Sequence, residues 1–259
     1  MKPLLSVKQL SLHFAGLKAV QDVSFDVAAG SIVGLIGPNG AGKTTLLNCL
    51  SRILNPTCGT IDYDGHDLLK RPVHRLSEIG VTRTFQNLEL FGEGTVLENV
   101  VVGCFPRFRS NMLSELLSLP GANRARRAAY EEARQLIDEL GLTAHVDTVV
   151  SGLPYGIQKS VELARALAGK PKLLLLDEPA AGMNPEESRQ LGQTIKEMRE
   201  ERGITVVLVE HDMRLVMGIC EKIIVLVQGA KVCEGPPQAV RENSMVIKAY
   251  LGEEEAEDA

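Results

Sequence analysis

The sequence predicts an α/β fold with a mostly parallel central sheet, an N-terminal antiparallel β subdomain and an inserted helical subdomain. Uninterrupted apolar runs occur at 31–36 (SIVGLI), 173–177 (LLLLD) and 205–210 (TVVLVE). Such runs are typical of parallel strands that helices cover on both faces. Helical patterns lie between these runs, and residues 87–152 read as helical, which indicates an insertion into the core.

The first strands are expected within roughly residues 4–36. LSLHF (10–14) and VSFDV (23–27) alternate apolar and polar residues, as half-buried strands do. The next apolar stripe is typical of a helix, because its members recur at helical spacing. It consists of Leu46, Leu47, Leu50, Ile53 and Leu54.

A second helix is predicted inside the insertion, and a third ends near residue 169. Gly169 followed by Pro171 is a helix stop signal after LARALA. The stripe of the second helix has i, i+3, i+4, i+7 spacing and consists of Ala133, Leu136, Ile137 and Leu140.

The stretch 104–126 of the insertion is expected to be irregular, and it is rich in arginine. We interpret it as a solvated loop with scattered charges, and a docking surface for another chain is the alternative. The arginines are Arg107, Arg109, Arg124, Arg126 and Arg127.

Composition excludes several classes of function. The 259 residues carry a net charge of −5, and the acidic tail 253–259 holds five carboxylates, so no basic excess calls for nucleic acid. We interpret the tail as solvated, with an interaction tail as the alternative. The five cysteines are scattered without CxxC spacing, so neither a disulfide framework nor a zinc site follows. No apolar run is long enough to span a bilayer, so any membrane role depends on another chain.

The segment 37–45 (GPNGAGKTT) fits the P-loop pattern between a strand and a helix, which predicts a P-loop NTPase. Its glycines let backbone N–H groups approach phosphate at a helix N-terminus. Lys43 is expected to reach the β- and γ-phosphates of ATP, and the Thr44 hydroxyl to bind Mg²⁺. The predicted ATP-binding residues of this loop are Gly37, Pro38, Asn39, Gly40, Ala41, Gly42, Lys43, Thr44 and Thr45.

Two carboxylates follow the apolar run LLLLD. Asp177 ends the predicted strand, so we expect it to hold Mg²⁺ through water. Glu178 comes next, at the strand edge where open α/β sheets bind ligands, and is the predicted general base for the attacking water. A strand that ends in a charged turn is the alternative, and the P-loop makes it the weaker one.

His211 follows the third apolar run, on the same predicted edge of the sheet. We therefore expect it to contact the γ-phosphate and to position the transition state. The remaining histidines have no such context and are expected to be surface or structural residues. They are His13, His66, His74 and His145.

Taken together, these motifs resemble an ATP-binding-cassette (ABC) ATPase over nearly the whole chain. RTFQN (83–87) is similar to the Q-loop, LPYGIQ (153–158) to the signature, AAGMN (180–184) to the D-loop and VEHDM (209–213) to the H-loop. The resemblance implies that Gln86 joins the metal site to the helical subdomain and acts in catalysis. It also implies that Phe14 stacks on adenine.

RTFQNLELF, PAAGMNP and the ending VIKAYLGE resemble the larger ATPase subunit of branched-chain or hydrophobic amino acid importers. The resemblance implies a second ATPase subunit, transmembrane permeases and a periplasmic binding protein as partners. It places the chain peripherally on the cytoplasmic face of the inner membrane. Cargo such as urea, amides or exported lipid is the alternative. A non-transport role on nucleic acid or as a scaffold is the weaker alternative, since the chain has one cassette and no sustained heptads.

The family's ATP sites lie between one subunit's P-loop and the other subunit's signature, so Tyr155 and Gly156 are expected to contact the partner's ATP. The common signature is Leu-Ser-Gly-Gly-Gln, and here Pro154 replaces the serine and Ile157 the glutamine. We expect backbone N–H groups at the helix start to replace the missing hydroxyl. NPEE (184–187) reads as a helix N-cap, so Asn184 is given no catalytic role.

The resemblance implies one ABC ATPase domain over residues 1–259. Its expected parts are a β subdomain with the P-loop part of the core (1–86), the helical subdomain (87–160), the rest of the core with C-terminal helices (161–252) and the acidic tail (253–259).

Overall fold

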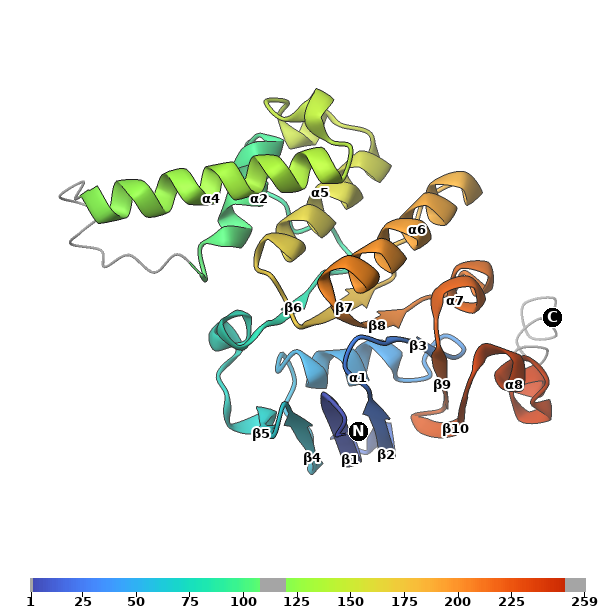
Figure 1. The fold of residues 1–259 in the computed structure, drawn as a ribbon. Coiled ribbons are helices and arrows are strands. Elements are labelled where there is room, and N and C mark those ends of the chain that lie inside the picture. The colour runs from blue at the N-terminus through green and yellow to red at the C-terminus, as the bar shows by residue number, and fades with distance from the viewer. Residues whose placement is uncertain (1, 108–119, 250–259) are drawn as a thin grey trace.

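The computed structural model describes residues 2–107 and 120–249, and its strands form a single mixed sheet (Figure 1). The strand order is β5-β4-β1-β2-β10-β9-β3-β8-β7-β6. The predicted fold class is therefore confirmed. The acidic tail 253–259 and Arg109 lie outside the described residues.

The N-terminal strands form the antiparallel part of the sheet. β1 pairs with β2 on one side and with β4 on the other, and the turn between β1 and β2 has positive φ at Ala15 and Gly16. Both predicted alternating segments lie in these strands, which confirms them. The bounds are β1 Leu5–Phe14, β2 Leu17–Val27, β4 Cys58–Tyr63 and β5 His66–Asp67.

The parallel part of the sheet contains the three predicted apolar runs. β3 lies between β8 and β9, and β7 lies between β8 and β6, all as parallel neighbours. Every residue of β3, β7 and β8 is buried, as the apolar runs predict. The bounds are β3 Ile32–Ile36, β6 Val81–Arg83, β7 Leu173–Asp177, β8 Thr205–Val209, β9 Lys222–Val227 and β10 Ala230–Gly235.

The first helix is shorter than its apolar stripe predicts. It ends at Leu50, because Ser51 is its C-cap and Arg52 adopts a left-handed φ of 61°. The predicted extension of the helix to Ile53 and Leu54 is therefore wrong: Ile53 is 46% exposed, whereas Leu54 still packs against the core from the turn that follows the helix. The helices of the core are α1 Lys43–Leu50, α6 Pro185–Arg202, α7 Met213–Ile219 and α8 Pro237–Arg241.

The predicted helix boundaries at Gly169 and Asn184 are confirmed. Gly169 is the C-cap of α5, which ends at Ala168. The Asn184 side chain accepts hydrogen bonds from the N–H groups of Glu186 and Glu187. The Glu187 carboxylate in turn accepts from the Asn184 N–H, so α6 starts in a capping box.

The helices of the insertion lie together on one side of the sheet (Figure 1). Their bounds are α2 Val96–Cys104, α4 Pro120–Glu139 and α5 Tyr155–Ala168. Because α4 begins at Pro120, the expectation of an irregular stretch up to 126 is wrong for residues 120–126. The expected boundary at residue 160 falls inside α5.

The arginines of this region divide into two kinds. Arg107 is not a solvated charge, because it pairs with Glu132 at 2.5 Å and donates to the Ala168 carbonyl oxygen at 3.2 Å. Arg124, Arg126 and Arg127 are exposed, as a solvated surface predicts.

Short 3₁₀ turns connect several elements. They are η1 Leu68–Lys70, η2 Val73–Arg75, η3 Ser77–Ile79, η4 Thr143–His145 and η5 Val150–Gly152. Two hydrophobic clusters form the core, one between the sheet and the helices that follow β6, the other around α1 and the N-terminal strands. Within 2–107 and 120–249, no helix has the length and apolar character needed to cross a bilayer.

Candidate nucleotide site

A pocket of about 740 Å³ brings most of the predicted site residues together at the carboxyl edge of the parallel strands. The predicted residues that line it are Phe14, Asn39, Gly40, Ala41, Gly42, Lys43, Thr44, Thr45, Gln86, Glu178 and His211. Gly37, Pro38, Asp177, Tyr155 and Gly156 do not line it. The other lining residues, which the sequence did not single out, are Leu17, Lys18, Ala19, Gln21 and Gln228.

The P-loop depends on glycine at two positions where the backbone is crowded. A methyl group on Gly37 would lie 2.0 Å from the carbonyl oxygen of Leu226, and one on Gly42 would lie 2.3 Å from that of Ala19. Both glycines also have positive φ, of 150° and 94°. No side chain caps the N-terminus of α1 at Gly42, so the first N–H groups of the helix remain available to an anion.

Lys43 is held inside the loop that it belongs to. Its side chain is buried, with 6% of the residue exposed, and Nζ donates to the carbonyl oxygens of Gly37 at 2.6 Å and Pro38 at 2.9 Å. Gly37 and Pro38 therefore do not line the pocket, but their carbonyl oxygens hold the Lys43 side chain. Lys43 lines the pocket at the N-terminus of α1, so its positive charge adds to the partial positive charge of the helix end there.

The two carboxylate oxygens of Glu178 contact two of the predicted catalytic residues, Gln86 and His211. Gln86 Nε2 donates to its Oε2 at 2.9 Å, and His211 Nε2 lies 2.7 Å from its Oε1. The Glu178 side chain is 14% exposed, and its backbone has φ 48°, a left-handed conformation that costs energy for a non-glycine residue. The backbone strain and the two partners fix the carboxylate at the edge of the pocket.

Asp177 lies beneath the pocket wall, with 1% of the residue exposed. Arg83 Nη2 donates to its Oδ2 at 2.7 Å. Oδ1 is buried and has no hydrogen-bond partner among the described residues. A buried carboxylate oxygen without a partner is costly unless a ligand or water satisfies it, so Oδ1 marks a place where a further group binds.

This arrangement fits Mg²⁺. The Asp177 oxygen and the Thr44 hydroxyl are hard oxygen ligands of the kind that Mg²⁺ prefers. The described residues contain no group of three or more His, Cys, Asp or Glu that could hold a metal ion. A bound Mg²⁺ would therefore depend on phosphate oxygens and water for its remaining ligands, which is its usual mode in nucleotide sites.

Glu210 orders two loops of the site, and the sequence analysis did not single it out. Glu210 is 3% exposed, and its carboxylate accepts from the N–H groups of Ala180 at 2.7 Å and His211 at 2.9 Å. It thus ties the loop after Glu178 to the loop that carries His211. The sequence does carry a signal for Glu210: it is an acidic residue directly after the apolar run of β8.

Helix α5 holds the Q-loop through two buried charged side chains, Lys159 and Glu162. The sequence analysis did not single them out either. Lys159 Nζ donates to the carbonyl oxygen of Gln86 at 3.0 Å, and Glu162 Oε1 accepts from the Phe85 N–H at 3.2 Å. Burial raises the pKa of Glu162, while the Phe85 N–H and Lys159 oppose the rise. Gln86 is therefore positioned from the same helix that begins at the signature.

The signature residues lie at the start of α5 and face the D-loop. Pro154 is the N-cap, with φ −54° and ψ 148°, and no side chain caps the helix. The ring of Tyr155 packs on Gly182, where an added methyl group would lie 3.1 Å from its Cε1. A methyl group on Gly156 would lie 3.3 Å from Glu187 Oε1. Tyr155 and Gly156 therefore line no part of this chain's own nucleotide pocket.

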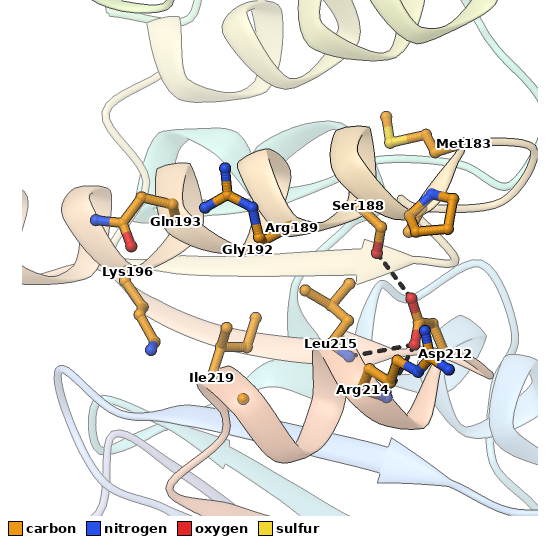
Figure 2. Close-up of a pocket in the computed structure, with 13 residues that line it drawn as sticks. Met183, Ser188, Arg189, Gly192, Gln193, Lys196, Asp212, Arg214, Leu215 and Ile219 are labelled. Atoms are coloured by element: carbon orange, nitrogen blue, oxygen red, sulfur yellow. Dashed lines mark hydrogen bonds between the residues drawn. The ribbon is translucent and has the colours of Figure 1, made fainter.

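A second groove, of about 640 Å³, lies between α6 and α7 (Figure 2). Its central acidic group, Asp212, caps α7 through the N–H groups of Arg214 and Leu215 and accepts from the Ser188 hydroxyl at 2.8 Å. The floor is apolar and includes Leu215 and Ile219. None of the predicted site residues line this groove, and Asp212 is already occupied, so we place no chemistry there.

Comparisons with known proteins identify the family of this chain. The family model of the ABC transporter matches residues 20–181, and a model described as branched-chain amino acid ATP-binding cassette transporter matches residues 230–256. The chain is 44% identical to BraF of Pseudomonas aeruginosa and to LivG of Escherichia coli (strain K12). Both are described as high-affinity branched-chain amino acid transport ATP-binding proteins, and each alignment covers 97% of this chain and 99% of the relative.

Other relatives and solved structures agree on the family. The lipopolysaccharide export system ATP-binding protein LptB of Acidithiobacillus ferridurans is 35% identical over 98% of this chain and 99% of its own. The ADP conformation of MJ1267, an ATP-binding cassette of an ABC transporter, has a TM-score of 0.83 and 28% identity, covering 97% of this chain and all of that one. The chain therefore belongs to the ATP-binding proteins of ABC transporters, and it is an ATPase.

Proposed function

We propose that this chain is the ATP-hydrolysing subunit of an importer for branched-chain or other hydrophobic amino acids. The observation that carries the proposal is similarity over the full length to BraF and LivG, at 44% identity. The C-terminal match at residues 230–256 supports it, because that model is described as branched-chain amino acid ATP-binding cassette transporter.

Each predicted site residue has a role in the proposed reaction. Phosphate binding draws Lys43 Nζ from the Gly37 and Pro38 carbonyl oxygens toward the β- and γ-phosphates, and the N–H groups of the loop bind the remaining phosphate oxygens. Phe14, which is 44% exposed in the pocket wall, stacks on adenine.

Glu178 is the proposed general base. It takes the proton of the attacking water, while Gln86 and His211 hold its two oxygens in position. His211 then contacts the γ-phosphate, since its ring lines the same pocket as Lys43. The left-handed backbone at Glu178 supports this role, because strained conformations cluster at active sites.

Mg²⁺ is the proposed cofactor, and Thr44, Asp177 and Gln86 are the residues that would hold it. When bound, the ion neutralises charge on the β- and γ-phosphates. Two observations support this assignment: Asp177 Oδ1 is buried with no partner within residues 2–107 and 120–249, and Thr44 lines the pocket.

The proposed working unit is a head-to-tail dimer of cassettes, with either a second copy or a similar subunit. Tyr155 and Gly156 would then contact ATP held by the partner's P-loop, because they lie at the free N-terminus of α5. A structural relative supports a dimer. The chain resembles the dimeric structure of MJ0796, a bacterial ABC transporter cassette, with a TM-score of 0.77 and 25% identity. The structural alignment covers 90% of this chain and 98% of the MJ0796 chain.

Permeases are the proposed membrane partners, and a periplasmic binding protein is an indirect one. A groove of about 260 Å³ between the core and the helices α2 and α5 offers a docking place, lined among others by Phe91, Pro106 and Arg165. The chain would then sit peripherally on the cytoplasmic face of the inner membrane. It would act as one domain, in which the helical subdomain moves against the core.

Lipid export is the second candidate function. It rests on the similarity to LptB, at 35% identity over nearly both full chains. The 44% identity to BraF and LivG and the C-terminal match favour amino acid import over it.

Reconstitution tests the proposal directly. The chain is co-expressed with any permease and cassette genes found beside its own and purified through a tag on this chain. The complex is placed in liposomes together with any binding protein encoded there. We expect ATP-dependent uptake of labelled leucine that urea does not compete with. Uptake of urea or amides alone, or ATPase stimulation by lipid without leucine uptake, would contradict the proposal.

A further inference from the structure

Arg83 is a buried arginine that joins three motifs of the site. It is the last residue of β6, which pairs with β7 in parallel so that Arg83 is opposite Leu175, two residues before Asp177. Its side chain is 7% exposed. The Q-loop residue Gln86 follows three positions later, so Arg83 stands where the Q-loop leaves the sheet.

The guanidinium group is held through its two terminal nitrogens, while Nε is buried without a hydrogen-bond partner among the described residues. Nη1 donates to Asn48 Oδ1 and to Ser51 Oγ, each at 2.6 Å, and these residues lie at the end of the P-loop helix α1. Nη2 donates to Asp177 Oδ2 at 2.7 Å. The group also lies over the ring of Phe85, with its carbon 5.1 Å from the ring centre. The planar fork therefore has a single defined orientation.

This arrangement decides which oxygen of Asp177 is available. Oδ2 is occupied by Arg83, and Oδ1 is buried with no partner in the part of the chain that the structure describes. Stability alone is a poor reason for such a pair, because apolar residues of similar volume often replace a buried ion pair at no cost. A fixed carboxylate with one remaining oxygen is what a metal ligand requires.

We propose that Arg83 is a positioning residue for the divalent cation: it holds the Asp177 carboxylate through Oδ2 so that Oδ1 serves the cation and its water. The inference rests on the proposed Mg²⁺ site. It adds a residue outside the P-loop, the signature and the catalytic group around Glu178, and it links the cation to α1 and to the Q-loop strand.

The test measures metal binding apart from catalysis. The full chain is saturated with ADP, and Mn²⁺ binding is followed by electron paramagnetic resonance. Affinity for fluorescent mant-ADP is measured separately in EDTA. For Arg83→Gln we expect the Mn²⁺ dissociation constant to rise about tenfold or more, the usual effect of removing a group that orients a ligand, with mant-ADP affinity in EDTA unchanged. Arg83→Lys should recover part of the loss, because it keeps the charge but not the fork.

Arg199→Gln is the matched control. Arg199 also pairs with a carboxylate, that of Glu221 at 2.5 Å, but Glu221 is not one of the residues proposed to hold the cation. It should leave the Mn²⁺ constant unchanged. If Arg83→Gln does not fold, as judged by circular dichroism, the double variant Asn48→Ala/Ser51→Ala removes the other anchor of Arg83 and should also weaken Mn²⁺ binding.

Two results would overturn the inference. One is an unchanged Mn²⁺ constant in Arg83→Gln, or in the double variant if Arg83→Gln does not fold. The other is an equal loss of mant-ADP affinity in EDTA, which a purely structural role would produce. A wild-type chain that binds no Mn²⁺ with ADP would instead overturn the proposed metal site itself, so the two failures are distinguishable.

Discussion

Pro154 is the residue that most separates this signature from the common one. It lacks the serine hydroxyl, and the loss of one donor to a charged oxygen costs about 1.5–3 kcal/mol if nothing replaces it. The structure places Pro154 at the N-cap of α5 with no side-chain cap, so the N–H groups of Tyr155, Gly156 and Ile157 remain available in the first turn. These groups are the replacement that our account requires.

Substitutions at the signature test this account. Pro154→Ser should leave ATP turnover within about threefold, because the backbone already supplies the donors. Gly156→Asp should abolish turnover, since its carboxylate would enter the anion site and approach Glu187, whose Oε1 is 3.3 Å from an added methyl group. Turnover is measured by phosphate release, with Pro154→Ala as the control. A large gain from Pro154→Ser would show that the native signature is impaired.

For single residues, the sequence predicts those that line the pocket better than those that hold the lining residues in place. Lys43, Glu178 and His211 stand in motifs whose spacing implies their positions, and all three line one pocket. Arg83 and Glu210 act through contacts between distant segments, Arg83 with Asp177 and Glu210 with Ala180. Nothing in the local pattern reveals such pairings, because they depend on which strands become neighbours.

Among the elements, helix α4 is linked to the segments after α2 and α5 by ion pairs of the half-buried Glu132 with Arg107 and Lys170. The hydrogen bond from Arg107 lowers the pKa of Glu132, burial opposes this, and Lys170 adds to the lowering. A carboxyl group whose pKa is lower in the folded state stabilises the fold above its unfolded pKa, where it is charged. That contribution is lost as the pH falls below the ordinary value of 4.5 toward the lowered one.

Glu132→Gln tests this tie. At about pH 7.5 we expect the melting temperature to fall by about 1–4 °C, the effect of a partly exposed ion pair in a chain of this size. The difference from wild type should shrink at about pH 4, because the unfolded wild-type chain takes up a proton at Glu132 there while the folded carboxyl group, with its lowered pKa, resists protonation. Calorimetry at both pH values measures it, and Glu131→Gln on the same helix is the control. An equal difference at both pH values would contradict the pairing.

The elements themselves are predicted best where periodicity and capping agree. The three buried strands and the capped start of α6 follow from the sequence pattern alone. The end of α1 does not, because the stripe continues to Leu54 while Arg52 turns into a left-handed conformation. The start of α4 was missed because its first turns, PGANRAR, carry no apolar stripe.

On the scale of the whole molecule, the nucleotide pocket and the signature are two separate surfaces of this chain. The P-loop, Gln86, Glu178 and His211 share a pocket, while the signature lies at a separate helix start and faces the D-loop through Tyr155 and Gly182. A nucleotide that bridges two such surfaces stabilises the closed pair by its greater affinity for that state. The central claim is therefore that ATP closes a dimer and that Glu178 ends the closed state by hydrolysis.

Glu178→Gln tests that claim most directly. Glutamine keeps the shape of the side chain beside Gln86 and His211 but cannot take the proton of water. The variant and wild type are incubated with ATP and Mg²⁺, together with any neighbouring cassette, and mass is followed by light scattering after size exclusion, with Lys43→Ala as the control that cannot bind ATP. We predict that Glu178→Gln hydrolyses ATP about 10²–10⁴-fold more slowly and accumulates as an ATP-bound dimer. A variant that hydrolyses ATP at the wild-type rate, or that binds ATP and stays monomeric, would contradict the account.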